Sequence, residues 1–259
     1  MDSSDLVGFT DTPELDFKWL KEASNGDEKI LTSFILRRKK GEPVAKIIGQ
    51  KGFWTLDLAV STATLDPRPD SETLIDAVLK QVPDKDTPLR ILDLGTGSGC
   101  LLLALLSEYK KATGIGIDIS QEALKIAQKN VDKYASDRAQ LIHNSWKNEK
   151  WWDGLGKFDI VISNPPYIPT ADIPFLDKDV KDYDPIEALD GGIDGLDDYR
   201  SLSYSIENVL KKEALVFFEI GKGQETDVIK IMKEKGFTLH ASYYDFGQIL
   251  RVLAFIKNH

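Results

Sequence analysis

The clearest structural signal in this chain is Ile91-Leu92-Asp93-Leu94-Gly95-Thr96-Gly97-Ser98-Gly99. An apolar run of strand length leads into a loop with three glycines, and a second apolar run begins at Cys100. This is the pattern of a buried strand, a tight loop and a helix. Because glycine lets the backbone approach a ligand closely, and because Asp93 adds an acceptor beneath the loop, the stretch predicts a ligand-binding site.

The glycine spacing argues against two common nucleotide-binding loops. In the dinucleotide-binding pattern G-x-G-x-x-G, the third glycine would stand where Cys100 stands. A phosphate-binding P-loop requires a Gly-Lys-Ser/Thr sequence that this loop lacks, and Asp93 would repel a polyphosphate. The next expected strand ends in Ile115-Gly116-Ile117-Asp118, whose carboxylate can accept hydrogen bonds from both hydroxyls of a ribose. A ribose contact alone is compatible with NAD and with S-adenosylmethionine.

Strand and helix patterns alternate along the rest of the chain. We expect strands at 90–94, 114–118, 140–143, 158–163 and 214–220, and helices at 100–109, 121–134, 197–210 and 225–235. This alternation is typical of a parallel, doubly wound, Rossmann-like α/β sheet. Residues 238–244 and 249–256 have strand character with no helix between them, so we expect them to pair antiparallel at the sheet edge.

The N-terminal residues indicate a small helical part that a hairpin joins to the sheet. We expect helices at 13–23 and 28–40 and a hairpin between 44 and 60. The run Arg37-Arg38-Lys39-Lys40 could contact a nucleic acid. Cations in the last turn of a helix also complement its dipole, and we favour that interpretation.

A stiff segment, Leu65-Asp66-Pro67-Arg68-Pro69-Asp70-Ser71-Glu72, follows the expected hairpin. Its prolines fix the backbone, and Asp70 or Ser71 could cap a helix at 73–81. The segment is either a connector or one wall of a site.

The sequence Asn164-Pro165-Pro166-Tyr167 stands directly after the expected strand at 158–163, where an open α/β sheet places its ligands. The asparagine can accept one hydrogen of a planar NH2 group, and because the prolines lack N–H donors, a backbone carbonyl is free to accept the other. Tyr167 offers a flat wall. The tetrapeptide fits an amide or exocyclic amine that accepts a methyl group, although Asn-Pro also starts ordinary turns.

Composition narrows the class of protein further. The 259 residues carry a net charge of −9, which argues against a nucleic acid as the main partner, because phosphates are held mostly by Lys and Arg. The one cysteine, Cys100, excludes an intrachain disulfide and a multi-cysteine metal site, so we expect no metal centre.

No apolar run reaches the roughly 20 residues that cross a bilayer. Residues 1–16 contain acids but no Lys or Arg, unlike a signal peptide, so we expect a cytoplasmic protein.

Three features together favour S-adenosylmethionine over NAD as the cofactor. They are the G-x-G-x-G loop, the strand-terminal Asp118 and the Asn-Pro-Pro-Tyr sequence. A sulfonium cofactor has no pyrophosphate, and its positive charge requires acidic rather than basic neighbours. Trp146 either flanks the adenine or is a partly buried core aromatic. The candidate cofactor-binding residues are Asp93, Gly95, Thr96, Gly97, Ser98, Gly99, Asp118, Ile119, Trp146 and Asn164.

With these motifs the chain resembles the HemK/PrmC family of S-adenosylmethionine-dependent methyltransferases, which modify N5 of a glutamine in class I peptide chain release factors. The likeness runs from about residue 41 to the C-terminus. Its specific parts are Pro67-Arg68-Pro69-Asp70-Ser71-Glu72 and Asp190-Gly191-Gly192-Ile193-Asp194-Gly195. Asn-Pro-Pro-Tyr is less specific, because adenine-N6 and guanine-N2 methyltransferases share it.

The resemblance implies a seven-stranded methyltransferase sheet with the last strand antiparallel. It implies a truncated helical N-terminal part at 1–42, a hairpin linker at 43–62 and a catalytic domain at 63–259. In one departure from the family, Asp66 stands where similar proteins usually have an apolar residue.

The resemblance also implies roles for individual residues. Gly95 to Gly99 would hold the methionine end of the cofactor, Asp118 the ribose and Trp146 the adenine. The catalytic and substrate-binding residues would be Asn164, Pro165, Pro166 and Tyr167, with Arg68 as a further substrate contact. The reaction would be in-line transfer of a methyl group to the glutamine nitrogen, with S-adenosylhomocysteine as the product.

Two alternatives remain, a related enzyme and a protein of another class. The first is an adenine or guanine methyltransferase acting on DNA or RNA, but acidic residues dominate between 171 and 198 and would repel phosphates. That segment either is a solvated surface loop or meets a basic protein surface. The second is a non-catalytic cofactor-binding protein, against which the intact motifs weigh. We expect a release factor as the partner, no stable nucleic-acid partner and no membrane.

Overall fold

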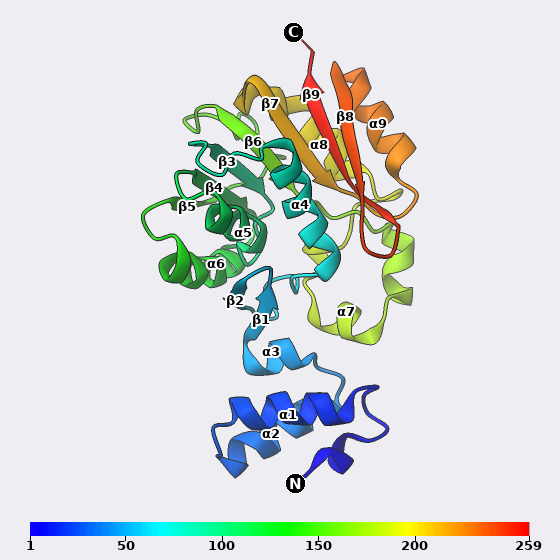
Figure 1. Ribbon diagram of the computed structural model, residues 1–259. Helices are drawn as coiled ribbons and strands as arrows, with labels where there is room; N and C mark the ends of the chain where they lie inside the picture. Colours follow the sequence, from blue (N-terminus) through cyan, green and yellow to red (C-terminus); the bar gives the residue numbers. More distant parts are fainter. Residues whose placement is uncertain (259) are drawn as a thin grey trace.

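A seven-stranded sheet forms the centre of the computed structural model, which describes residues 1–258 (Figure 1). The strand order is β5-β4-β3-β6-β7-β9-β8, and β9 alone runs opposite to the other six strands. The strands are β3 (Arg90–Leu94), β4 (Thr113–Asp118), β5 (Ala139–His143), β6 (Phe158–Ser163), β7 (Leu210–Glu219), β8 (Phe237–Tyr244) and β9 (Leu250–Lys257). The doubly wound fold with an antiparallel last strand is confirmed.

Helices cover both faces of this sheet (Figure 1). On one face lie α4 (Glu72–Gln81), α5 (Cys100–Glu108) and α6 (Gln121–Tyr134), and on the other lie α8 (Asp197–Ser205) and α9 (Glu225–Glu234). Residues 101–106 of α5 are buried without a break, because the sheet covers one side of the helix and α4 and α6 flank the other. None of the helices within residues 1–258 is long and apolar enough to cross a membrane.

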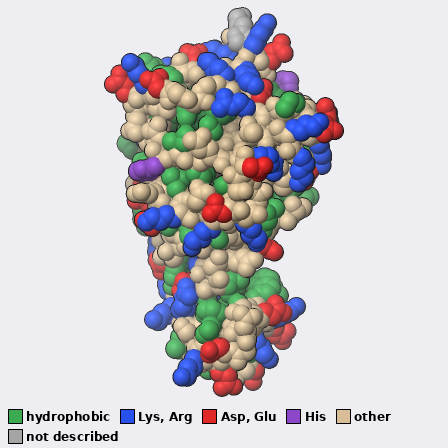
Figure 2. Space-filling view, turned by 90° about the vertical axis from the view of Figure 1, so that its left-hand side faces the viewer, with side chains coloured by type: hydrophobic (Ala, Val, Ile, Leu, Met, Phe, Trp, Pro, Cys, Tyr) green, Lys and Arg blue, Asp and Glu red, His purple; other side chains and the backbone are tan. Residues whose placement is uncertain are grey.

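A separate small core holds the N-terminal part together. It is built by η1 (Ser3–Leu6), α1 (Pro13–Ala23), α2 (Glu28–Lys39) and α3 (Val44–Ile48). Its buried residues are Leu6, Leu20, Leu31, Ile35 and Ile47. The hairpin of β1 (Gln50–Phe53) and β2 (Leu56–Ala59) leads from this part to the sheet. Figure 2 shows the narrow junction between the two parts, and positive and negative side chains are interspersed on the face it presents.

The linking hairpin is shorter than we expected, because Val44–Ile48 forms α3 instead of a strand. Pro43 stands before the first turn, and Gly49 ends the helix with a left-handed φ of 73°. Packing of Ile47 into the N-terminal core overrides the strand preference of its β-branched neighbours. The division into parts at 1–42, 43–62 and 63–259 stays a prediction.

Two expectations about helix ends were wrong. The helix expected at 197–210 ends at Ser205 and is followed by the short turn η5 (Ile206–Val209), because Leu210 already pairs with β6 in the sheet. Neither Asp70 nor Ser71 caps α4 with its side chain, because the turn η2 (Pro69–Ser71) leads directly into the helix. The acidic segment between residues 171 and 198, for which we expected no helix before 197, also folds locally. It forms η3 (Thr170–Phe175), α7 (Lys178–Tyr183) and η4 (Ile186–Ala188).

A buried ion-pair network joins the N-terminal part to the loops above the sheet. The side chain of Lys46, in α3, is 0% exposed, and its ammonium group donates to the carbonyls of Ser61 and Thr64. The same nitrogen lies 2.9 Å from Asp66 Oδ1 and 3.0 Å from Asp184 Oδ1. Position 66 is where the chain departs from the family that it resembles. The carboxylate of Asp66 is neutralised there by the buried ammonium group of Lys46.

Replacement of this cation should destabilise the fold. Lys46→Met should lower the free energy of unfolding by roughly 3–5 kcal/mol, because it leaves the buried Asp66 carboxylate without its cation and Asp184 with Arg68 alone. Adding Asp66→Asn to that variant should recover part of the loss. The matched control is Lys125→Met, whose ion pair with Glu122 is exposed and contributes about 0–1 kcal/mol. Denaturant titration measures each value, and equal losses for the two lysine variants would contradict the buried network.

Candidate active site

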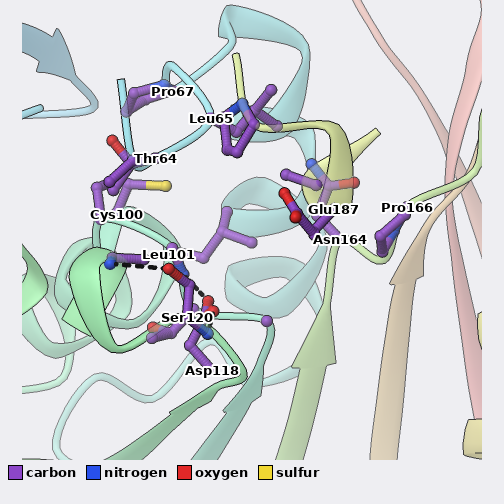
Figure 3. Close-up of a pocket in the computed structure, with 18 of the residues that line it drawn as sticks. Thr64, Leu65, Pro67, Cys100, Leu101, Asp118, Ser120, Asn164, Pro166 and Glu187 are labelled. Carbon is purple, nitrogen blue, oxygen red and sulfur yellow. Dashed lines mark hydrogen bonds between the residues drawn. The ribbon is translucent and has the colours of Figure 1, made fainter. Parts of the chain in front are cut away.

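The ends of three neighbouring strands bring the sequence motifs together. β3 pairs with β4 and with β6, and Leu94 lies opposite both Ile117 and Ser163. The residues that follow these positions therefore stand at one edge of the sheet, where open α/β sheets bind ligands. A cavity of about 410 Å³ opens there, within the size range of small-molecule sites. Figure 3 shows Asp118 on one side of it and Asn164 with Pro166 on another.

The backbone of the glycine loop is anchored to the end of β4. The N–H groups of Gly95 and Thr96 both donate to the Ile117 carbonyl, at 2.9 and 3.0 Å, and the Gly97 N–H donates to Asp118 Oδ2 at 2.8 Å. Gly95 and Gly97 have φ angles of 79° and 56°, a conformation that costs other residues roughly 1–2 kcal/mol. The loop therefore needs glycine at these two positions for its backbone conformation.

Two carboxylates stand beside and beneath this loop. Asp118 Oδ1 accepts from the Ser120 N–H at 2.8 Å, and burial raises the pKa of Asp118. Asp93 is fully buried, and its Oδ2 accepts from the Thr96 hydroxyl at 2.6 Å. Burial, reinforced by the charge of Asp118, raises the pKa of Asp93 to about 7. Because a carboxylate has about four acceptor positions, Asp118 can still receive hydroxyls from a ligand.

Trp146 is a partly buried aromatic of the core that also reaches the cavity, and its contact with an adenine stays a prediction. Its ring lines the cavity and also packs against the core on the α8 side of the sheet. The indole N–H donates to Asp198 Oδ1 at 2.9 Å, which fixes the ring, and a Cβ placed at Gly95 would lie 3.3 Å from it. The tryptophan therefore gives the cavity a rigid flat wall next to the glycine loop.

The Asn-Pro-Pro-Tyr sequence divides between the cavity and the core. Asn164 and Pro166 line the cavity, whereas Pro165 is buried and Tyr167 packs against the core on the α8 side. The Pro165 carbonyl has no hydrogen-bond partner among residues 1–258. Burial raises the pKa of Tyr167 to about 12, so its hydroxyl is neutral at physiological pH.

The segment at 190–195 supports this tetrapeptide by close backbone packing. A Cβ at Gly191 would lie 2.7 Å from the Pro166 carbonyl oxygen, and one at Gly195 would collide with the Tyr167 carbonyl. The side chain of Gln224 donates to the carbonyls of Tyr167 and Gly195, at 3.0 and 3.1 Å. The glycines of this segment are therefore required for holding the tetrapeptide in place.

The cavity brings together most of the site residues that the sequence indicated. Those that line it are Arg68, Gly95, Thr96, Gly97, Ser98, Asp118, Ile119, Trp146, Asn164 and Pro166. Those that do not are Asp93, Gly99, Pro165 and Tyr167. The roles given to all of these residues stay predictions.

One wall of the cavity is formed by Pro185, Glu187 and Ala188, which no sequence pattern indicated. This wall is tied to the stiff segment at 65–72, which forms a second wall of the cavity and is not merely a connector. The tie is an ion pair in which Arg68 donates to Asp184 Oδ2 at 2.6 Å. These two residues are 116 positions apart, so no local pattern could have indicated the contact.

The chain has relatives among known proteins. Residues 85–248 match a family model described as a methyltransferase domain. The chain is 41% identical over 258 residues to the release factor glutamine methyltransferase of Agrobacterium fabrum, covering 97% of this chain and 87% of that one. It is 44% identical over 211 residues to the protein of the same name from Rhodospirillum rubrum, covering 81% and 63%.

A solved structure has a similar fold. The ribosomal protein L11 methylase from Lactobacillus delbrueckii subsp. bulgaricus has a TM-score of 0.53 and 22% identity, over 75% of this chain and 83% of that one. At this identity the likeness concerns the fold alone.

The buried Asp93 should make stability depend on pH. Because its pKa of about 7 in the folded protein exceeds the unfolded value of about 4, the folded state holds an extra proton between these limits. This stabilising effect is lost as the pH rises toward about 7. Asp93→Asn should therefore become more stable relative to the parent, by on the order of 1–3 kcal/mol, over that range.

Denaturant titration across this pH range measures the difference. The matched control is Asp86→Asn, which changes an exposed carboxylate. Parallel stability curves for the parent and Asp93→Asn would show that Asp93 does not bind the extra proton.

Proposed function

Because the chain belongs to the family of release factor glutamine methyltransferases, we propose that it methylates a glutamine side-chain nitrogen, that of the Gly-Gly-Gln motif in class I peptide chain release factors. One observation carries this proposal at the level of the site. Asp118, which ends β4, and Asn164, which follows β6, line the same cavity. A group for holding a ribose and a group for holding an amide thus face one space.

We assign this cavity to S-adenosylmethionine. The glycine loop allows close approach of the backbone, Asp118 offers acceptors to the ribose, and the rigid Trp146 ring suits a flat adenine. The buried carboxylates Asp93 and Asp118 make this edge of the sheet suitable for a cation. When bound, the cofactor supplies an electrophilic methyl group on a sulfonium.

Asn164 and the Pro165 carbonyl are the residues that prepare the acceptor nitrogen. An amide nitrogen is a weak nucleophile because its lone pair is delocalised into the carbonyl. Asn164 Oδ1 would accept one hydrogen of the glutamine amide and the Pro165 carbonyl, free of other partners, the second. This arrangement raises electron density on nitrogen and fixes its direction of attack, and such positioning can contribute roughly 7–11 kcal/mol.

The surroundings of the cavity favour a protein substrate over a nucleic acid. Glu187 lines the cavity, and the segment from 171 to 198 that leads to and from it is rich in acidic residues. These carboxylates would repel phosphates and attract cationic side chains. We assign Arg68, which lines the cavity, and Tyr167, which follows the two prolines, to the substrate side of the site.

Asn164→Ala should separate chemistry from cofactor binding. Loss of one positioned hydrogen-bond acceptor should lower the single-turnover rate of methylation by roughly 10²–10³-fold. Cofactor affinity, measured by calorimetry, should change little, because the glycine loop and Asp118 are intact. If the variant also loses its cofactor affinity, Asn164 holds the cofactor and this division of roles is wrong.

A labelling experiment tests the substrate. The protein is incubated with cofactor that carries a labelled methyl group and separately with a release factor, with that factor after replacement of its Gly-Gly-Gln glutamine, and with total nucleic acid. Label should enter only the intact release factor. Label in nucleic acid alone would establish the nucleobase methyltransferase instead, and cofactor binding without any transfer would establish the non-catalytic protein.

A further inference from the structure

Glu219 is a buried acidic residue next to the site, and the mechanism above leaves it unused. It is the last residue of β7 and is 2% exposed, and its Oε2 atom has no hydrogen-bond partner among residues 1–258. β7 pairs in parallel with β6, with Phe218 opposite Ser163. The next residues on the two strands are Glu219 and Asn164, so these two side chains leave the sheet at the same level.

Both side chains point to the α4 face of the sheet. Two residues earlier on each strand, Ile162 and Phe217 belong to the core that packs against α4 and α5, and strand side chains alternate between faces. Ser71, which stands directly before α4, is buried on this face. The amide nitrogen of Asn164 donates to Ser71 Oγ at 3.5 Å. Asn164 thus lies between the cavity and a buried cluster of two hydrogen-bond acceptors, the Ser71 hydroxyl and the Glu219 carboxylate.

The chemistry of this cluster selects one end of the asparagine amide. A carboxamide has an NH2 end that donates and an oxygen end that accepts, whereas an ionised carboxylate only accepts. A buried carboxylate beside Asn164 therefore favours the NH2 end toward itself. The oxygen end is then turned toward the cavity, where the proposed reaction needs an acceptor.

We propose that Glu219 is a positioning residue whose carboxylate, together with Ser71, holds the NH2 end of Asn164 and so presents Asn164 Oδ1 to the glutamine amide. This inference rests on the proposed function for its catalytic consequence. The orientation of Asn164 itself requires no substrate.

The ionisation of Glu219 should control this orientation. Burial raises the pKa of Glu219 to about 7, against the opposing hydrogen bonds from Ser71 and Asn164 and the charge of Arg251. A protonated carboxyl also donates, so it no longer discriminates between the two ends of the amide. The other groups that face Glu219 are the Asp70 carboxylate, the Cys100 thiol of α5 and the phenols of Tyr167 and Tyr199. The thiol and both phenols are neutral at physiological pH, and the Tyr199 hydroxyl donates to the Glu219 carbonyl at 2.8 Å.

Glu219→Gln mimics the protonated state and is the first test. The single-turnover rate of methylation at saturating cofactor should fall by roughly 10–100-fold, because the acceptor is misplaced in part of the molecules. The rate of the parent should rise with a one-proton step near a pH of about 7, and the variant should lack that step. Cofactor affinity should stay close to that of the parent. A variant with the parental rate and the parental pH step would overturn the proposal.

A second variant separates positioning from a merely structural role. Asn164→Asp has no NH2 end, and its carboxylate would be repelled by Glu219. Adding Glu219→Gln to Asn164→Asp should therefore raise the methylation rate, although the same change lowers the rate of the parent. A further fall in the double variant would mean that Glu219 does not act through Asn164.

The last measurement is independent of the methyl acceptor. The side-chain NH2 signals of Asn164 are observed in a proton–nitrogen correlation NMR spectrum. They are identified by their absence from the spectrum of Asn164→Ala. They should titrate with a pKa of about 7 in the parent and should not titrate in Glu219→Gln. If they do not titrate in the parent, the proposal fails. If they titrate and no release factor is methylated, the proposal stands and only the function is wrong.

Discussion

The site depends on the parallel pairing of β3, β4 and β6 with their carboxyl ends at one level. Each of these strands is separated from the next by a long excursion of the chain, yet the glycine loop, Asp118 and Asn164 meet at one edge. The alignment is enforced by cores on both faces, because a slip of one residue would exchange the faces of every side chain on a strand. Such a slip in β6 would turn Asn164 away from α4 and remove it from Ser71.

The walls of the cavity depend on a second constraint, the burial of Lys46. One ammonium group contacts the carboxylates of Asp66 and Asp184, and these belong to the two loops that enclose the cavity. Arg68 closes the link by pairing with Asp184. Since Lys46 belongs to the N-terminal part, the shape of the site depends on a residue outside the sheet. Without this cation the buried Asp66 carboxylate would face Asp184 uncompensated, and only the partly exposed Arg68 would hold the two walls together.

Sequence patterns predicted the regular elements well and the contacts between distant elements poorly. α1, α6, β3 and β6 have the predicted ends, because the two helices show an apolar stripe and the two strands are short apolar runs. α3 was missed because five residues are too few to show a helical period, and its formation depends on Ile47 packing against α1 and α2. The glycine loop and Asn164 could be identified from spacing alone. Glu187, Lys46 and Glu219 could not, since their importance comes from partners far away in the chain.

Three buried acidic residues at the same sheet edge make the site costly to fold. Burial raises the pKa of Asp93, Asp118 and Glu219, so each disfavours folding in its ionised form. A bound cation reverses that preference, because it favours the ionised forms of the carboxylates around it. Binding of a sulfonium should therefore be coupled to proton release from the carboxylates at the glycine loop, Asp93 and Asp118. Glu219 does not line the cavity, and its ionised form acts instead on Asn164, by selecting the NH2 end of that side chain.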